Sequence, residues 1–297
     1  AAEMARVCPS VDSVVVDEGQ PLKDLVHRIR IERFDAAIAL FSEQRISFAT
    51  FLARIPYRLG PATKIYQFLF NDRLVQRRST SSKPEYFYNC DLIVHFLKKT
   101  GVAVPKLPQP PYLRVDEKCR EDAKARIMAT HTVPKGARLV IVHPGSGGSA
   151  GNLSLAGYST LVNCLKSDHP LFILVTAGPG EKKLAESVVR QINVHPCAVY
   201  NSEDGLSAFS GVISVSDVFI SGSTGPLHIA GALDVPTAAF YPRRKSSTAL
   251  RWQTTNSSER RLAFSPPWSA PEQDLESIDL NRVAATINRY YLNANCA

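Results

Sequence analysis

The sequence lacks an apolar run long enough to cross a bilayer, and its first residues lack the basic and then apolar pattern of a signal peptide. It also lacks any pair of cysteines spaced as CxxC or CxxxC, which argues against a zinc site. Its six cysteines are scattered over 297 residues, an arrangement that does not demand disulfides. These absences favour a cytoplasmic protein in a reducing compartment.

The chain does contain ample apolar material and an excess of positive charge. Apolar residues make up 44% of the sequence and charged residues 21%, which argues against global disorder and allows one large or two medium domains. The formal net charge of +8 favours an anionic partner, such as nucleic acid, a phosphorylated substrate or an anionic membrane surface. A solvated basic face would explain the same charge, so composition alone leaves both interpretations open.

Short apolar runs alternate with longer helical patterns, as they do in α/β proteins built from βαβ units. The first series predicts strands at 14–16 and 35–41 and helices at 22–33, 46–53 and 86–100. A basic, irregular stretch occupies 58–83. The prolines between 102 and 112 break both helices and strands, so this segment is typical of a linker.

A second series follows a polar helix predicted at 116–130. It predicts strands at 138–142, 171–176, 198–200, 218–221 and 237–241, and helices at 154–166, 181–191, 205–215, 226–233 and 279–292. The alternation predicts an α/β fold of two doubly wound, Rossmann-like domains whose strand ends face a cleft. We place the N-terminal domain at 1–112 and the C-terminal domain at 113–297, with the last helix, 279–292, packing back on the N-terminal domain.

A glycine-rich loop at 143–149, His-Pro-Gly-Ser-Gly-Gly-Ser, follows a predicted strand and precedes a predicted helix. Its small residues allow tight turns and expose N–H groups to an anion, and the helix behind it adds a positive dipole end. An ordinary connection between strand and helix has the same composition. The spacing matches neither GxxxxGK[ST] nor GxGxxG, so it indicates neither an ATPase nor a dehydrogenase.

A second loop, 220–226, is more specific. Thr224 or Gly225 is suited to cap the following helix, and Pro226 suits its first helical position. That helix is apolar on all sides, so we expect it to be buried, with its N-terminus open at the strand ends where a diphosphate binds well. His228 falls in its first turn and is placed to donate to a phosphate oxygen, although a lone histidine there also fits a satisfied core residue.

The run Ser-Thr-Gly-Pro-Leu-His-Ile-Ala-Gly-Ala-Leu-Asp-Val-Pro-Thr at 223–237 resembles the signature of glycosyltransferase family 9, the ADP-heptose:lipopolysaccharide heptosyltransferases. Members of that family carry a (D/S)TGPxH(L/I)AxALxxPT segment that binds the donor diphosphate. Residues 143–146 resemble the second donor loop of the family, and 174–181 resemble the segment whose glutamate contacts the donor ribose. The run Arg-Leu-Gly at 58–60 resembles a turn of the acceptor domain, so the resemblance covers essentially the whole chain.

The resemblance implies a GT-B fold and transfer of a heptose, with inversion, from ADP-heptose to the lipopolysaccharide inner core. The residues that it implies for donor binding are Ser146, Gly147, Asn152, Glu181, Ser223, Thr224, Gly225, Pro226 and His228, with adenine against 203–208. On the acceptor side it implies Arg58 and Lys64. It implies neither a metal nor a cofactor, because N–H groups and a helix N-terminus can stabilise the departing ADP.

The family also begins with a strand, a loop and a helix that carry a catalytic aspartate, and this sequence contains no such segment. Residues 1–16 instead resemble the end of the second helix and the third strand of the family's first domain. The catalytic residue therefore stays unknown. We expect either that the sequence is a piece of a longer protein, without its N-terminal strand–helix unit, or that the protein has lost its base.

The stretch 58–83 interleaves basic and aromatic residues, a pattern that also suits nucleic acid. With the family resemblance, we expect it to contact the phosphorylated lipopolysaccharide core and the anionic inner leaflet, and we expect no nucleic acid partner. The protein would then be cytoplasmic, with peripheral contact to the inner membrane. Two alternatives remain: a non-catalytic nucleotide-sugar-binding protein of the same fold, and a nucleotide-sugar epimerase, which fold analogy alone supports.

Overall fold

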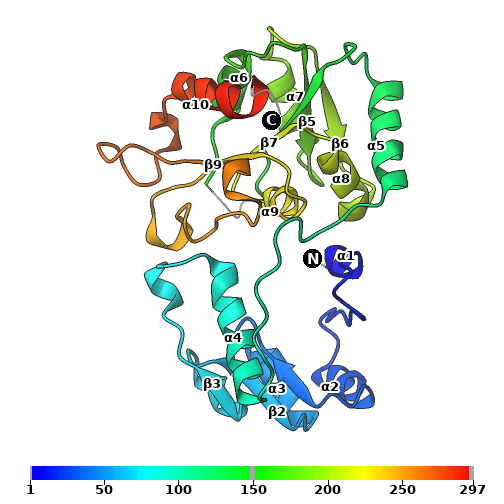
Figure 1. Cartoon of the computed structure of the whole chain (residues 1–297), viewed down its shortest axis with the longest axis vertical. Helices are drawn as coiled ribbons and strands as arrows, with labels where there is room; N and C mark the ends of the chain where they lie inside the picture. The colour runs from blue at the N-terminus through cyan, green and yellow to red at the C-terminus, as the bar shows by residue number, and fades with distance from the viewer. Residues whose placement is uncertain (1, 148–150, 294–297) are drawn as a thin grey trace. The chain divides into compact units, whose positions relative to one another are not determined.

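The computed structural model describes residues 2–147 and 151–293. The chain divides into two compact units (Figure 1). The smaller unit spans Val15–Leu107, and the larger one comprises the described parts of Ala1–Val14 and Pro108–Ala297. The sequence places the boundary after 112 and assigns the whole N-terminus to the first domain; the structure places it after 107 and packs 2–14 with the larger unit.

The short N-terminal helix explains that difference. Helix α1 (Ala2–Arg6) contacts α8 (Gly205–Ser214), and the Glu3 carboxylate accepts hydrogen bonds from the N–H groups of Leu206 and Ser207 at 2.6 and 3.2 Å. A carboxylate at the first turn of a helix compensates the positive end of the helix dipole. The strand predicted at 14–16 does not form: these residues have no regular secondary structure.

The smaller unit is built on a three-stranded parallel sheet in the order β1-β2-β3. Its strands are β1 (Ala36–Ile38), β2 (Tyr57–Pro61) and β3 (Asp72–Leu74), and its helices are α2 (Leu22–Ile31), α3 (Gln44–Leu52) and α4 (Glu85–Lys99), with single 3₁₀ turns at Ile65–Leu69 and Arg78–Thr80. Helices α2 and α3 pack together around Leu25 and Ala49. Two of the strands lie in the stretch that the sequence predicts as irregular.

The larger unit has a six-stranded, wholly parallel sheet in the order β6-β5-β4-β7-β8-β9. Its strands are β4 (Arg138–His143), β5 (Leu171–Ala177), β6 (Cys197–Asn201), β7 (Val218–Gly222), β8 (Thr237–Phe240) and β9 (Arg261–Phe264). Its helices besides α1 and α8 are α5 (Glu117–Thr130), α6 (Leu155–Asn163), α7 (Lys182–Val189), α9 (Gly225–Ala232) and α10 (Leu280–Ile287), which continues as a π-helical turn at Asn288–Leu292. This order confirms the doubly wound fold, because the chain runs outward from β4 to one edge and then returns to β7.

The helices cover both faces of the large sheet, so its inner strands β5, β7 and β8 are buried on two sides, while the edge strands β6 and β9 are only partly buried. In β4 successive residues alternate: Val140 and Val142 join the core under α6, α7 and α10, and Ile141 joins the core under α5, α8 and α9. Figure 1 shows α6 and α10 on one side of this sheet and α5 and α8 on the other. Two-sided burial explains why the strands read as continuous apolar runs in the sequence.

The last helix packs within the larger unit, and its predicted packing against the N-terminal domain stays a prediction. Helix α10 lies against α6, and its Val283 and Ile287 are buried in the core of the larger unit. The carbonyl of Tyr291 accepts a hydrogen bond from the Arg138 guanidinium at 2.9 Å, and the Asn288 side chain accepts one from the N–H of Lys166 at 2.9 Å. These contacts fix the end of the described chain to the sheet of its own unit.

Candidate functional site

The two loops singled out in the sequence lie side by side. Strands β4 and β7 are neighbours in the sheet, with His143 paired to Ser221, so the loops that follow them leave the same edge. The Ser221 hydroxyl donates to the carbonyl of His143 at 3.0 Å. The chain reverses its winding direction between these two strands, which is where open α/β sheets form ligand crevices.

Thr224 caps helix α9; it is one of the two capping residues, with Gly225, that the sequence allows. Its side chain is the N-cap and accepts from the N–H of Leu227, and it lies 3.1 Å from the Ser221 hydroxyl. Gly225 and Pro226 form the first turn. Because Thr224 is buried and held on both sides, the N-terminus of α9 presents a fixed set of N–H groups at the edge of the sheet.

Two cavities open on either side of Thr224 and Gly225, and both are lined by residues of the larger unit. The first, which we call the Phe209 cavity, holds about 470 Å³; the second, the Trp252 cavity, holds about 690 Å³. Leu206, Phe209 and Pro226 give the Phe209 cavity an apolar wall, with Glu181 at its rim. The Trp252 cavity has a polar lining of serines, Gln273, Arg244 and His228 around one indole ring.

Glu181 lies on the glycine-rich loop after β4. Its Oε1 accepts hydrogen bonds from the N–H groups of Ser146 and Gly147 at 3.1 and 2.9 Å, and its Oε2 accepts one from the N–H of Gly178 at 3.3 Å. The same carboxylate leaves no room for a Cβ at Gly145. The two N–H groups that the sequence suggests for a diphosphate are therefore already paired with a carboxylate of the chain itself. Gly148 and Ser149, at the end of this loop, lie outside the described residues.

Asn152 ties the two loops together. Its Nδ2 donates to the carbonyl of Pro144, and its Oδ1 accepts from the hydroxyl of Tyr158. The same oxygen is so close to Gly222 that a Cβ there would lie 2.6 Å from it, which explains the glycine at the end of β7. Asn152 thus holds the loop after β4 against the end of β7, whereas the sequence suggests it for donor binding.

His228 projects from the first turn of α9 into the Trp252 cavity. Its ring lies edge-on to the indole of Trp252 at 6.3 Å, and burial lowers its pKa below the ordinary value. A neutral imidazole at pH 7 still has one N–H to donate. The Trp252 Nε1 donates to the carbonyl of Ser246 at 2.9 Å, which fixes the indole against the cavity.

Sequence reasoning missed Trp252 and Gln273. They come from segments after β8 that carry no local motif, and only the fold brings them to the N-terminus of α9. It also missed the role of His143, the last residue of β4. His143 is 4% exposed, lines the Phe209 cavity and shares a hydrogen bond of 2.9 Å with the Thr176 hydroxyl; burial lowers its pKa to about 4.

In the smaller unit, Arg58 and Lys64 have different surroundings. The Arg58 guanidinium donates to the carbonyls of Leu69 and Ile55 and lies 5.5 Å from the Phe51 ring, so it holds the backbone together. Lys64 is exposed just before the 3₁₀ turn at Ile65–Leu69. Of the two acceptor residues suggested by the sequence, only Lys64 presents its charge freely to solvent.

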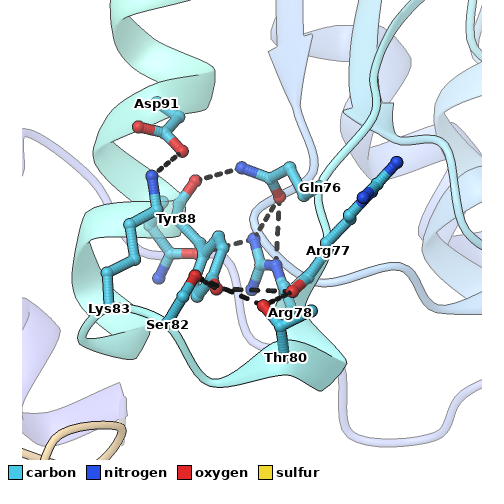
Figure 2. A network of polar contacts seen from close by, with 9 residues as sticks. Gln76, Arg77, Arg78, Thr80, Ser82, Lys83, Tyr88 and Asp91 are labelled. Atoms are coloured by element: carbon cyan, nitrogen blue, oxygen red, sulfur yellow. Dashed lines mark hydrogen bonds and ion pairs between the residues drawn. The ribbon is translucent and has the colours of Figure 1, made fainter.

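Several other cations of the basic stretch serve a polar network with Tyr88 at its centre (Figure 2). Arg78 pairs with Glu85 at 2.7 Å and with Gln76, and Lys83 pairs with Asp91. Figure 2 shows that the guanidinium of Arg77 instead points away from this network, while its carbonyl accepts hydrogen bonds from Thr80 and Tyr88. Arg77 therefore joins Lys64 as an outward-facing cation.

The buried carboxylate of Asp72 forms a second polar cluster in the smaller unit. It accepts from the hydroxyl of Tyr57 and lies 3.0 Å from both His95 and Lys99. Burial alone would raise the pKa of Asp72, but these hydrogen bonds outweigh it and hold the pKa well below its usual range. Asp72 is the first residue of β3, at the edge opposite the strand ends that form ligand sites, so we interpret the cluster as structural.

The described residues offer little else for metal or proton chemistry. Residues 2–147 and 151–293 hold no cluster of three or more histidine, cysteine, aspartate or glutamate side chains placed to bind a metal.

No helix within these same ranges is long and apolar enough to cross a membrane. The carboxylates among the described lining residues of the two cavities are Glu3 and Glu181, and both accept backbone hydrogen bonds.

Comparisons with known proteins agree on the family. Residues 22–277 match the model of "Glycosyltransferase family 9 (heptosyltransferase)". A protein of Haemophilus influenzae, whose name describes a glycosyltransferase and states no donor or acceptor, is 37% identical over 297 residues, which cover 98% of this chain and 86% of that protein.

Solved structures share the fold. E. coli ADP-heptose lps heptosyltransferase II superposes with a TM-score of 0.76 at 18% identity, over 97% of this chain and 86% of that one. E. coli heptosyltransferase WaaC, solved with ADP, gives a TM-score of 0.66 at 14% identity, over 97% and 87% of the two chains. At these identities the likeness concerns the fold, which confirms the GT-B class.

Proposed function

Because the chain belongs to glycosyltransferase family 9, we propose that it transfers a heptose from ADP-heptose to the inner core of lipopolysaccharide, with inversion at the anomeric carbon. The observation that carries this proposal is the N-terminus of α9, capped by Thr224 and flanked by a cavity on each side. This arrangement fits a ligand with a nucleoside at one end, a diphosphate in the middle and a sugar at the other end.

The residues that line the two cavities suggest which cavity holds the nucleoside of the donor and which holds its sugar. The Phe209 cavity has the apolar wall that a base needs and the Glu181 carboxylate that ribose hydroxyls need. The Trp252 cavity has hydroxyl, amide and imidazole groups suited to sugar hydroxyls and phosphate oxygens. In the solved WaaC structure of the same fold the ligand is ADP, which supports adenosine as the nucleoside.

Departure of ADP is the step that these residues can assist. The bond between the anomeric carbon and the phosphate oxygen breaks, and negative charge develops on the diphosphate. The backbone N–H groups at the N-terminus of α9 and the imidazole N–H of His228 are fixed in place, and they stabilise that charge without reorganising. No metal is needed for such a mechanism, and a base must take the proton of the acceptor hydroxyl.

The acceptor would bind to the smaller unit. Lys64 and Arg77 face outward there, and Ile65 and Phe68 beside Lys64 are 83% and 73% exposed. Cations mixed with exposed apolar groups suit a phosphorylated, carboxylated glycolipid and the anionic inner leaflet. The protein would therefore work in the cytoplasm, in peripheral contact with the inner membrane and without nucleic acid.

One observation favours a second candidate, a nucleotide-sugar-binding protein without transfer. Among the described residues that line the two cavities, the carboxylates of Glu3 and Glu181 are both engaged with backbone N–H groups, so neither is placed as a base. Such a protein would bind ADP and release none from ADP-heptose. The family match leaves the epimerase alternative without support.

The deciding experiment combines binding and turnover. The complete product of the gene is incubated with ADP-heptose and heptose-deficient lipopolysaccharide, and ADP release is followed; ADP binding is measured separately by calorimetry. ADP release that depends on the acceptor supports the transferase. Binding without release supports the second candidate, and a protein that binds no ADP contradicts both.

A further inference from the structure

Two arginines and a lysine follow β8 in a row, and the structure gives them different surroundings. Arg243 is held in place: its N–H donates to the carbonyl of Glu272 at 2.8 Å, its guanidinium donates to the carbonyl of Ala270, and its Cζ lies 4.5 Å from the centre of the Trp268 ring. Arg243 therefore fixes the segment around Trp268.

Arg244 faces the other way, into the Trp252 cavity, together with Thr224, Gly225 and His228. It is exposed, and its guanidinium makes no hydrogen bond or ion pair with any residue in the described ranges, 2–147 and 151–293; its carbonyl accepts a hydrogen bond from the N–H of Ser247 at 2.8 Å. Within those ranges it is also the one lysine or arginine that lines this cavity, which Lys245 does not reach.

The charge around this cavity is one-sided. No aspartate or glutamate lies among its described lining residues, while the guanidinium of Arg244 and the N-terminus of α9 both contribute positive potential. Field lines concentrate in a cavity of this kind and attract an anion. A guanidinium also presents paired N–H donors that match phosphate oxygens in a bidentate geometry.

We propose that Arg244 binds the donor diphosphate, and specifically the phosphate that lies farther from the nucleoside. This inference rests on the proposed function. The position follows from the cavities: Thr224 and Gly225 line both, whereas Arg244 lines only the Trp252 cavity, on the side away from the apolar wall of Phe209. When the bond between the anomeric carbon and that phosphate oxygen breaks, its electron pair stays on the nucleoside diphosphate, next to the guanidinium.

The test compares ADP with AMP, which lacks the second phosphate. Isothermal titration of the whole chain should show that Arg244→Ala weakens ADP binding by roughly 10- to 100-fold, as expected for a lost hydrogen bond to a charged group. AMP binding should change by less than about threefold, which is small on the same scale. The matched control is Lys245→Ala, which removes the neighbouring charge outside the cavity and should leave both affinities near those of the wild type.

A second variant moves the charge within the cavity. Gly151 lines the same cavity, and a Cβ there would meet only ordinary contacts, 3.6 Å from Leu275 and 3.8 Å from Pro242. In the double variant Arg244→Ala/Gly151→Lys, a cation should return to the cavity and restore part of the ADP affinity without affecting AMP. A purely structural role of Arg244 predicts no such rescue.

The outcomes separate this inference from the proposed function. A wild-type chain that binds ADP, with an Arg244→Ala variant that binds it equally well, overturns the role of Arg244 alone. Equal loss of ADP and AMP affinity overturns it too, because the effect would then not depend on the second phosphate. A wild-type chain that binds none of ADP, UDP and GDP contradicts the proposed function and this inference together.

Discussion

Glu181 accepts a hydrogen bond of 2.9 Å from the backbone N–H of Gly147. With the N–H of Ser146 on the same oxygen, the carboxylate occupies a pair of donors that otherwise suits an anion. A donor phosphate at Ser146 and Gly147 would have to displace Glu181. We therefore expect the phosphates to lie at the N-terminus of α9, while Glu181 keeps the glycine-rich loop closed beside the ribose.

The first prediction concerns this contact. Glu181→Ala should weaken ADP binding by about tenfold, because the glycine-rich loop loses two charge-assisted hydrogen bonds and the ribose loses an acceptor. Calorimetric titration with ADP measures the effect. If the carboxylate competed with the phosphate instead, the alanine variant would bind ADP more tightly than the wild type, and the expected role would be wrong.

Gly145 offers an independent check of the same contact. A Cβ at this position collides with the Glu181 carboxylate, so Gly145→Ala should push the carboxylate off the loop. We expect its ADP affinity to fall to about the level of Glu181→Ala, and the double variant to be no weaker than either single one, since both remove one contact. Additive losses would show that the two residues act separately.

The second prediction concerns the cap of α9. Thr224→Val keeps the shape of the side chain but removes the hydroxyl that accepts from Leu227 and meets Ser221, so we expect a loss of about 1 kcal/mol in the free energy of unfolding and weaker ADP binding. Thr224→Ser retains the hydroxyl and is the matched control. Urea unfolding and ADP titration measure the two effects; a valine variant that matches the serine one would contradict the assignment.

The sequence predicts the larger unit well for a physical reason. Strands such as 171–177 are buried on both faces and read as nearly continuous apolar runs, and the cap at Thr224 depends on its immediate neighbours alone. In the smaller unit β3 has three residues, two of them charged, and its formation depends on pairing with β2, so no local pattern marks it.

In the candidate site, too, the sequence predicts the residues of a local motif but not the contacts between distant segments. Thr224 and His228 are four residues apart on one loop and helix, and their motif is visible in the sequence. Glu181 meets Gly147 from 34 residues away, and Arg244 reaches the cavity from beyond β8. Contacts of this kind depend on the order of strands in the sheet, which a single sequence does not contain.

The third prediction concerns the buried cluster at Asp72. Asp72→Ala leaves Lys99, His95 and Tyr57 without their shared acceptor, so we expect a loss of about 3 kcal/mol in the stability of the smaller unit at pH 7. The control Asp91→Asn removes the carboxylate of Asp91, which pairs with Lys83 and whose side chain is 41% exposed. This variant should lose less than about 1 kcal/mol of stability. Hydrogen exchange of β3 and α4 localises the effect, and equal protection in both variants would contradict the prediction.

The fourth prediction concerns the pH dependence of stability that His143 imposes. Burial lowers its pKa from 6.5 to about 4 in the folded chain, so between these pH values the unfolded chain binds a proton that the folded chain does not. Titration of His143 therefore does not reduce the free energy of unfolding above pH 6.5. As the pH falls from 6.5 towards 4, it lowers the free energy of unfolding by about 3 kcal/mol in total. His143→Asn cannot titrate, so urea unfolding from pH 7 to 4 should show a shallower decline for the variant than for the wild type. Parallel declines would mean that the buried imidazole is protonated in the folded chain, against the neutral state that its burial between Thr176 and Phe219 requires.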